Sequence, residues 1–346
     1  MRQKAIRFCI GIGIAALGIL LVGGSQAIGQ GIRDGLLVSG QVLIPSLFPF
    51  MVLSGFIAIT DWGRVLSYPL RPITQRIYKL PQDLGVVMAI SLVGGYPIGA
   101  KTISTLLKEG RINKATAQRM LCFCVNAGPA FVVSAVGAGM FADRRIGIIL
   151  FICQVISTLI VGAVVSYSSN IPQVARPEFA NRKNSEAFVE AVSGASSSMI
   201  VMCAFAVLFS GIAAMLADLE GVSRVILSGF LEVAAGNIAA AQIGGEMAVV
   251  LASMFISFSG LSVIFQVMFF FKGQEISFWP FFISRIAHGV ISSILTLIIY
   301  RRIYAHTPAW MPTSAPIMYA DDRTLILSIC LIIMSTMLVL SVKKYK

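Results

Sequence analysis

The sequence predicts an all-α polytopic membrane protein, built from two pseudo-symmetric repeats with broken or re-entrant helices. Three observations support this fold class: the composition is strongly apolar, the apolar runs are long enough to cross a bilayer, and one segment recurs farther along the chain. Of the 346 residues, 57% are hydrophobic and 12% are charged, and the mean hydropathy is +0.87. Soluble domains carry roughly 25% charged residues, so most of this apolar surface must face lipid or other buried helices. The composition therefore excludes soluble enzymes and free-standing soluble binding modules.

Several apolar stretches are uninterrupted and close to the ~20 residues that cross a bilayer. The first follows Arg2, Lys4 and Arg7 and ends at Val22. A retained span explains it better than a cleaved signal peptide, because it is long for a signal sequence and the chain downstream is also membranous. The other stretches cover residues 41–60, 146–167, 198–216, 281–300 and 324–342. Together with the interrupted stretches described next, they predict about 8 full spans plus about 2 hairpins.

Four further apolar stretches are interrupted by glycine, proline and polar residues; they cover residues 84–107, 115–141, 225–243 and 247–271. Non-helical backbone at membrane depth leaves N–H and C=O groups unpaired unless protein, water or a ligand satisfies them. For a single glycine, close helix packing or a kink is the simpler explanation. Two interruptions in each half, with polar residues beside them, instead indicate a transporter with a binding site near the bilayer midplane.

An internal match indicates that the architecture is duplicated. Residues 32–60 align without a gap on residues 188–216, at a fixed offset of 156, so that Asp34 falls on Glu190. Each copy is an acidic amphipathic segment followed by a span, and each is followed by two interrupted segments and a clean span. The sequence leaves open whether the repeats are inverted or parallel, because both arrangements give the same numbers of Lys and Arg on the two sides.

These features divide the chain into five parts. We expect an N-terminal transmembrane helix over 1–29, a first repeat over 30–167, a linker loop over 168–187, a second repeat over 188–300, and a loop with a C-terminal transmembrane helix over 301–346. The distribution of basic clusters places both termini in the cytoplasm.

Three charged residues lie inside the apolar stretches, where each costs at least a few kcal/mol unless it has a partner or a function. Lys101 could present its ammonium to an anion at the start of a helix, or extend to the membrane interface. Glu232 could carry a coupling proton or hold a cation, or form a structural salt bridge with Lys101 or Arg285. Arg285 and His288 are three residues apart and share one helix face, so they could clamp a carboxylate. His288 could equally be a hydrogen-bonded structural residue.

The uncharged polar residues at the interruptions suit a polar solute, including one with a ring. The complete predicted substrate site combines these residues with the glycines, prolines and charged groups around them: Gly94, Gly95, Tyr96, Pro97, Lys101, Asn126, Gly128, Pro129, Glu232, Asn237, Ser259, Gly260, Ser262, Gln266, Arg285 and His288.

The sequence carries no pattern that is typical of enzymes or metal sites. It has two histidines, no Cys-x-x-Cys pair, no phosphate-binding loop and no grouping of nucleophile and base. We therefore expect no catalytic residue, no metal and no cofactor, apart from a coupling proton or cation. The net charge of +12 comes from short basic clusters between apolar runs, which indicates membrane topology and not nucleic-acid binding. The expected partners are a small solute, the lipid bilayer, and either a second copy of the chain or another membrane protein.

Six short motifs carry a family resemblance: PSLFPF at 45–50, GGYPIGAK at 94–101, CVNAGPAF at 124–131, LEVAAGN at 231–237, SFSGLSVIFQ at 257–266 and RIAH at 285–288. In this ordered set the chain resembles membrane proteins with nucleoside-recognition (GATE) domains, in particular the YlbJ-type sporulation integral membrane proteins. It departs from the family pattern in one place. Where the family has Gly-Gly-Leu-Ser followed by His and Gln, this chain has Ser259-Gly260-Leu261-Ser262 and then Ile264 and Gln266.

The resemblance implies a permease of the bacterial cytoplasmic membrane in an endospore former, similar in logic to concentrative nucleoside transporters. Sporulation members of the family are associated with moving dipicolinate, a small aromatic dicarboxylate, which Lys101 and Arg285 would suit. We therefore expect a secondary transporter for a small polar, anionic solute. Two alternatives stay open: a nucleoside or nucleobase permease that uses Glu232, Asn126 and Asn237, and a non-transporting sporulation membrane assembly protein.

Overall fold

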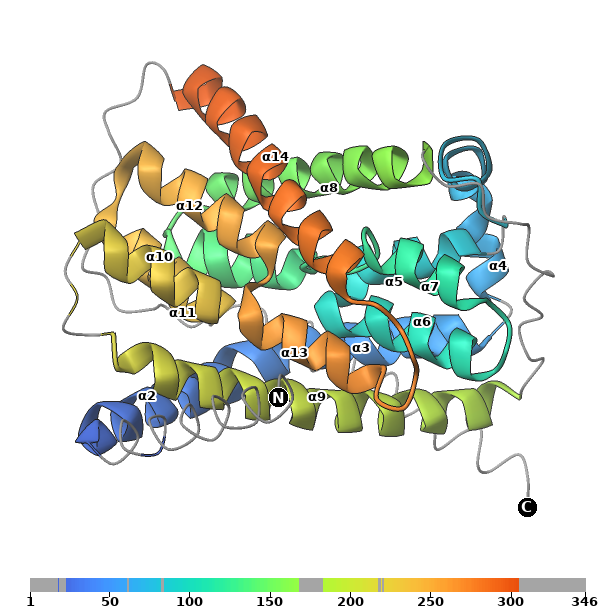
Figure 1. Ribbon diagram of the computed structural model, residues 1–346, viewed down its shortest axis with the longest axis horizontal. Helices are drawn as coiled ribbons and strands as arrows, with labels where there is room; N and C mark the ends of the chain where they lie inside the picture. Colours follow the sequence, from blue (N-terminus) through green and yellow to red (C-terminus); the bar gives the residue numbers. More distant parts are fainter. Residues whose placement is uncertain are drawn as a thin grey trace, which may run out of the picture.

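A computed structural model describes residues 18, 23–60, 62–81, 84–167, 183–216, 219 and 221–304, and within these ranges every regular element is a helix. Most of the helices lie roughly along the long axis of the molecule (Figure 1). The expected all-α fold is thus confirmed. The spans predicted near the N-terminus (1–29) and at 324–342 fall largely or wholly outside the described residues.

The first half begins with α2 (Ser25–Val38), a π-helical turn η1 (Ser39–Leu43) and α3 (Ile44–Ile59). The helix formed by α2 and η1 is bent by 56° relative to α3. Pro45 lies in the first turn of α3 and Pro49 lies inside the helix; prolines and π-helical turns are both common causes of such bends. Three short elements follow among the described residues, α4 (Trp62–Ser67), η2 (Tyr68–Leu70) and η3 (Ile73–Ile77). The chain then returns to the apolar segments with α5 (Gly85–Gly94).

The rest of the first half contains two interruptions and one long helix. Helix α6 (Tyr96–Lys108) follows α5 after a break at Gly95. Helix α7 (Lys114–Leu121) is separated from the π-helical segment η5 (Ala130–Met140) by non-helical backbone, and α8 (Arg144–Tyr167) closes the half. Both interruptions lie where the sequence predicts them.

The second half has the same order of elements. A long helix α9 (Asn184–Ala214) precedes a helix pair broken at Glu232, α10 (Gly221–Leu231) and α11 (Val233–Ile243). A second pair, α12 (Gly245–Phe258) and α13 (Gly260–Phe270), is broken at Ser259 and leads to the closing helix α14 (Trp279–Tyr304). This common order agrees with the predicted duplication, while the repeat itself and the number of spans stay predictions.

Among the residues that the structure describes, four helical segments are long and apolar enough to cross a membrane: α8, α9, residues 245–270 and α14. The bent pair of α2 with α3 is a fifth if it is counted as one span. Two predicted boundaries differ from the observed helices. Helix α9 begins at Asn184, inside the expected linker at 168–187, and α14 continues to Tyr304, beyond the expected end of the second repeat at residue 300. Amphipathic turns at the ends of an apolar run extend the helix past the run itself, because their backbone bonds do not depend on side-chain polarity.

Small residues set how closely the long helices pack. A Cβ added to Gly31 of α2 would lie 2.6 Å from the Ser210 carbonyl oxygen of α9, and one added to Gly55 of α3 would lie 3.5 Å from the Ala191 Cβ. Helix α2 therefore packs on the C-terminal half of α9 and α3 on its N-terminal half, so the segment 25–59 runs antiparallel to α9 (Figure 1).

Candidate functional site

The two interruptions of the first half touch each other. The chain leaves α5 through Gly95, whose φ of +86° is open to glycine and strained for other residues. A Cβ added to Gly128, in the second interruption, would lie 2.9 Å from the Val93 carbonyl oxygen and 3.3 Å from the Gly95 nitrogen. A glycine is therefore required at 128 for the two broken backbones to meet. Tyr96 and Pro97 are buried in the first turn of α6, directly after this junction.

The two interruptions of the second half also meet. Ser259 has a φ of +81°, a left-handed conformation that is rare outside glycine, and it ends α12. A Cβ on the following Gly260 would lie 3.2 Å from the Val233 nitrogen and 3.4 Å from the Leu231 carbonyl oxygen, on either side of Glu232. The paired contacts of the first half thus recur in the second.

Two side chains join the halves at these junctions. The Tyr96 hydroxyl donates a hydrogen bond of 2.6 Å to the carbonyl oxygen of Ile256, shortly before the break at Ser259. Arg285 on α14 donates from its two terminal nitrogens to the carbonyl oxygens of Val125 and Cys122, each at 2.5 Å. The interruptions are consequently parts of one polar centre that is assembled from both halves.

Side chains of α8 satisfy the non-helical backbone between α7 and η5. The amide group of Gln154 donates to the Ala127 carbonyl oxygen at 2.9 Å and accepts from the Ala127 nitrogen at 3.3 Å. Thr158 donates to the Asn126 side-chain oxygen at 2.6 Å, and Asn126 itself donates to the Phe123 carbonyl oxygen. Backbone that would be unsatisfied in a membrane is therefore paired with side chains.

Gln154 and Thr158 are missing from the predicted site, although a signal for them exists. They lie four residues apart in an apolar run and therefore on one helix face. Both are fully buried. Polar residues with this spacing inside a membrane helix indicate a hydrogen-bonding face, and the prediction concentrated on the interrupted segments alone.

Arg285 is the most unusual group in this centre. Its side chain is 0% exposed, and among the described residues no carboxylate lies within 4 Å of it. Its guanidinium carbon lies 5.4 Å from the centre of the Phe281 ring, and its Nε has no hydrogen-bond partner in the described part of the chain. A buried cation is costly when only carbonyl dipoles offset its charge, so the centre as a whole favours a negative charge.

His288 lies one turn farther along α14 and is also fully buried. Its Nε2 is 3.0 Å from the Thr158 hydroxyl and 3.1 Å from the Gln154 carbonyl oxygen, and its own carbonyl accepts from Ser157. The two residues that the sequence places on one helix face therefore both hold α14 to the first half. The contacts of His288 fit the structural alternative for this residue.

Glu232 forms the cap of α11. Its carboxylate accepts a hydrogen bond of 2.6 Å from the Ala235 nitrogen, and its side chain is only 3% exposed. A carboxylate at a helix N-terminus is stabilised by the unpaired N–H groups and the helix dipole. Within the described ranges it makes no ion pair, so the alternative of a salt bridge with Lys101 or Arg285 does not hold here.

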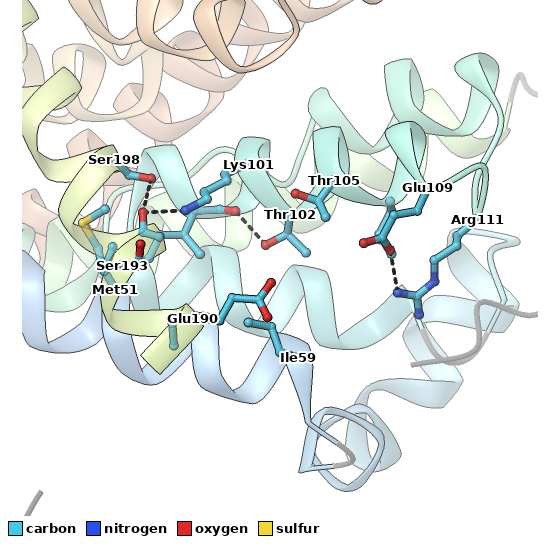
Figure 2. Close-up of a pocket in the computed structure, with 16 residues that line it drawn as sticks. Met51, Ile59, Lys101, Thr102, Thr105, Glu109, Arg111, Glu190, Ser193 and Ser198 are labelled. Carbon is cyan, nitrogen blue, oxygen red and sulfur yellow. Dashed lines mark hydrogen bonds and ion pairs between the residues drawn. The ribbon is translucent and has the colours of Figure 1, made fainter. Parts of the chain in front are cut away.

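Lys101 lies apart from the polar centre. Its ammonium donates to the Gly194 carbonyl oxygen of α9 at 2.5 Å. It lines a cavity of about 350 Å³ together with Glu190, Ser193 and Ser198 of α9 (Figure 2). Lys101 and Arg285, the two cations that would suit a dicarboxylate, therefore have separate partners: Arg285 binds the second interruption, whereas Lys101 binds α9.

Several of the other predicted residues are buried with unused polar atoms. In the described part of the chain no partner is found for the side-chain oxygens of Asn237, Ser259 and Gln266, or for that of Ser257, which lies in the same 257–266 motif but outside the predicted site. Asn237 and Gln266 use their amide nitrogens locally, on Val233 and Ser262 respectively. Buried polar atoms are nearly always paired in folded proteins, so this group marks a place where a solute or water is expected. Gly94 packs on Ser54 of α3, and Pro129 precedes η5.

No group of three or more His, Cys, Asp or Glu side chains able to hold a metal occurs among the residues that the structure describes. The described cysteines, Cys122, Cys124, Cys153 and Cys203, are free thiols.

The fold and the site together define an integral membrane protein whose broken helices meet at a buried polar centre. The chain is similar to the sporulation integral membrane protein YlbJ of Bacillus subtilis (strain 168), with 26% identity over 328 residues that cover 82% of this chain and 80% of that protein. This similarity confirms the predicted resemblance to the YlbJ-type family. No family model matches the chain. No solved structure matches it.

Proposed function

We propose that this protein is a secondary transporter, not an enzyme, and that its four helix interruptions bind a small anionic solute. The observation that carries the proposal is the environment of Arg285. This cation is fully buried where the two halves meet, and its hydrogen bonds within the described residues go to backbone carbonyls. A carboxylate of the solute would supply the missing negative charge, and the planar guanidinium suits a carboxylate better than an ammonium does.

The unused polar atoms support the same location. Ser259 forms one interruption of the second half, and Asn237, Ser257 and Gln266 lie on the helices that flank the two interruptions. The Tyr96 hydroxyl of the first half binds Ile256 on one of these helices. Buried Phe258 directly precedes Ser259 and contacts Phe230 edge to face, with the ring centres 4.8 Å apart. A solute with a ring and several oxygens would therefore find both apolar and polar contacts.

The relative extends the proposal to a biological setting. Because the related protein is named as an integral membrane protein of sporulation, we propose that this chain belongs to an endospore-forming bacterium and lies in its cytoplasmic membrane. The distribution of basic clusters supports the proposal that both termini are in the cytoplasm. Within that setting we propose dipicolinate as the substrate, because it is the aromatic dicarboxylate that the family resemblance implies. A proton or cation would drive uptake, with Glu232 as the candidate coupling group.

Ligand-dependent thermal stability of the detergent-purified protein tests the binding step. A ligand that binds only the folded state adds about 2.7 kcal/mol of stability at about 100 times its Kd. We expect dipicolinate to raise the Tm of the parent chain and of Arg302→Gln, a matched control on the exposed end of the same helix, but not of Arg285→Gln. If Arg285→Gln does not fold, Arg285→Lys replaces it in the test. This variant keeps the positive charge but lacks the planar guanidinium with its parallel N–H donors, and it should bind dipicolinate more weakly.

Transport in proteoliposomes completes the test. Dipicolinate uptake by the parent chain that is lost in the Arg285 variant supports the proposal. Stabilisation by nucleosides alone would favour the nucleoside permease. Equal stabilisation of parent and Arg285→Lys would contradict the role given to the guanidinium. A folded parent that binds and transports none of these solutes, and that co-purifies with a membrane partner, would favour the assembly protein.

A further inference from the structure

Two cavities of nearly equal size lie along α9. The first, of about 350 Å³, is bounded by α3, α6 and the N-terminal half of α9, and contains Lys101 and Glu190 (Figure 2). The second, of about 340 Å³, is bounded by α2, α11 and the C-terminal half of α9, and contains Asp34 and Glu232. Each cavity thus lies beside a helix that directly follows an interruption: α6 follows Gly95 and α11 follows Glu232.

The internal match of the sequence relates the two cavities. At the offset of 156 residues, three positions that line one cavity fall on positions that line the other: Asp34 on Glu190, Gly35 on Ala191 and Val38 on Gly194. The acidic residue of each copy therefore faces a cavity formed with the other copy. Chance similarity between apolar sequences does not predict that matched residues would line matched cavities.

The matched segments run in opposite directions, which separates the cavities. The segment 25–59 is antiparallel to α9, so Gly35 lies beside Val207 and Ser210, whereas Gly55 lies beside Ala191. Asp34 is next to Gly35 and therefore lies near Val207 of α9. Val207 and Glu190 are about 17 residues apart along α9, which corresponds to about 26 Å at about 1.5 Å per residue. This is close to the ~30 Å thickness of the hydrocarbon core, so one cavity lies near each face of a membrane that α9 crosses.

The second cavity borders the polar centre, whereas the first is connected to it through helix α6. Tyr96 begins the helix that carries Lys101, and its hydroxyl contacts Ile256 of the second half. Glu232 lines the second cavity and lies at the junction with Gly260. A solute in the second cavity is therefore in contact with an interruption, and a solute in the first lies against the helix whose first turn contacts the other half.

We propose that these cavities are the two access routes, on opposite membrane faces, to one central site, and that inverted repeats make them equivalent. This inference rests on the proposed transporter function, but its geometry can be tested separately. Opening one route requires α6 to leave α9, which breaks the contact of Lys101 with Gly194. Opening the other requires α11 to leave α2 and α9.

Cysteine accessibility tests the opposite placement. Asp34→Cys and Glu190→Cys occupy matched positions, one in each cavity, and Ile44→Cys and Ile200→Cys form a matched control pair on exposed apolar surface. Each variant is treated with a membrane-impermeant sulfonated methanethiosulfonate in right-side-out and in inside-out vesicles. The parent chain measures the background from its own cysteines. Only thiols in contact with water react, because the cysteine must ionise before its thiolate attacks the reagent, forming a mixed disulfide and releasing methanesulfinate.

We expect Asp34→Cys to react from one face only and Glu190→Cys from the opposite face only, with no reaction at the two isoleucine positions. Reaction of both cavity positions from the same face would overturn the inference, and so would the absence of reaction in a variant shown to be folded. Opposite labelling in a protein that binds and transports no solute would keep the inverted arrangement of the cavities, but it would remove both the proposed transport function and the role of the cavities as access routes.

Discussion

The side chain of Gln154 offers the sharpest test of how the polar centre is held together. Replacing it with Met keeps a similar volume and removes both hydrogen bonds to Ala127. The Ala127 nitrogen and oxygen are then buried without hydrogen-bond partners, and each unsatisfied group costs about 1–3 kcal/mol of folding free energy. Gln154→Met should therefore destabilise the protein by about 2–6 kcal/mol, although no cavity is created.

The assay compares unfolding of the parent, Gln154→Met and a control in the same detergent. Gln118→Met is the control, because within the described residues the Gln118 side chain makes one hydrogen bond, of 3.3 Å, to the Ser277 carbonyl oxygen near the surface. Surface substitutions of that kind change the free energy of unfolding by no more than about 0.5 kcal/mol. Hydrogen exchange of the segment between α7 and η5 adds a local measurement, since the loss of Gln154 should raise exchange there before it does elsewhere.

Equal stability of Gln154→Met and Gln118→Met would refute this reasoning. It would mean that the backbone of Ala127 has other partners in the membrane, and that the interruption does not depend on α8. A large loss of stability without faster exchange between α7 and η5 would also contradict it, because the effect would then be global packing and not the release of this segment.

Two further predictions concern packing and charge. Gly99→Ala places a Cβ 1.8 Å from the Cys124 carbonyl oxygen and should cost about 1–3 kcal/mol or more in stability. The control Gly40→Ala meets nothing within 4 Å and should be neutral or slightly stabilising in the same unfolding assay. In the loop between α13 and α14, a hydrogen bond from Lys114 lowers the pKa of Glu275. A carboxyl group whose pKa is lowered in the folded state stabilises that state at pH values above the ordinary pKa of the group. This stabilisation is lost as the pH falls through the lowered pKa. A Tm difference between the parent and Lys114→Gln should be present at neutral pH and disappear in acid; a difference that persists in acid would contradict the pairing.

The separation of Lys101 from Arg285 changes how a substrate would be recognised. The sequence allows both cations to bind one anion, whereas the structure places Arg285 at the junction of the halves and Lys101 in the first cavity. A dicarboxylate would then meet Lys101 on the way to the centre and Arg285 within it. Neutralising Lys101 should slow association more than it weakens final binding, because a charge in an access route acts mainly on encounter.

Composition and local pattern determined the membrane class, the helical fold and the positions of the interruptions. These features depend on the solvation of apolar side chains and on the backbone preferences of Gly, Pro and polar residues, which act over a few neighbours. The break at Ser259 follows from its position before Gly260 in an otherwise apolar run, and the break at Gly95 from the glycine and proline beside it.

Only the tertiary structure decided which polar groups meet. Arg285 and Val125 are 160 positions apart in the chain, and Tyr96 and Ile256 are as well. Such contacts depend on how helices from the two halves pack, and that packing is set by small residues at many crossings and not by any local pattern. For the same reason the roles of Gln154 and Thr158, the separation of Lys101 from Arg285, and the antiparallel course of the matched segments appear only when the chain is folded.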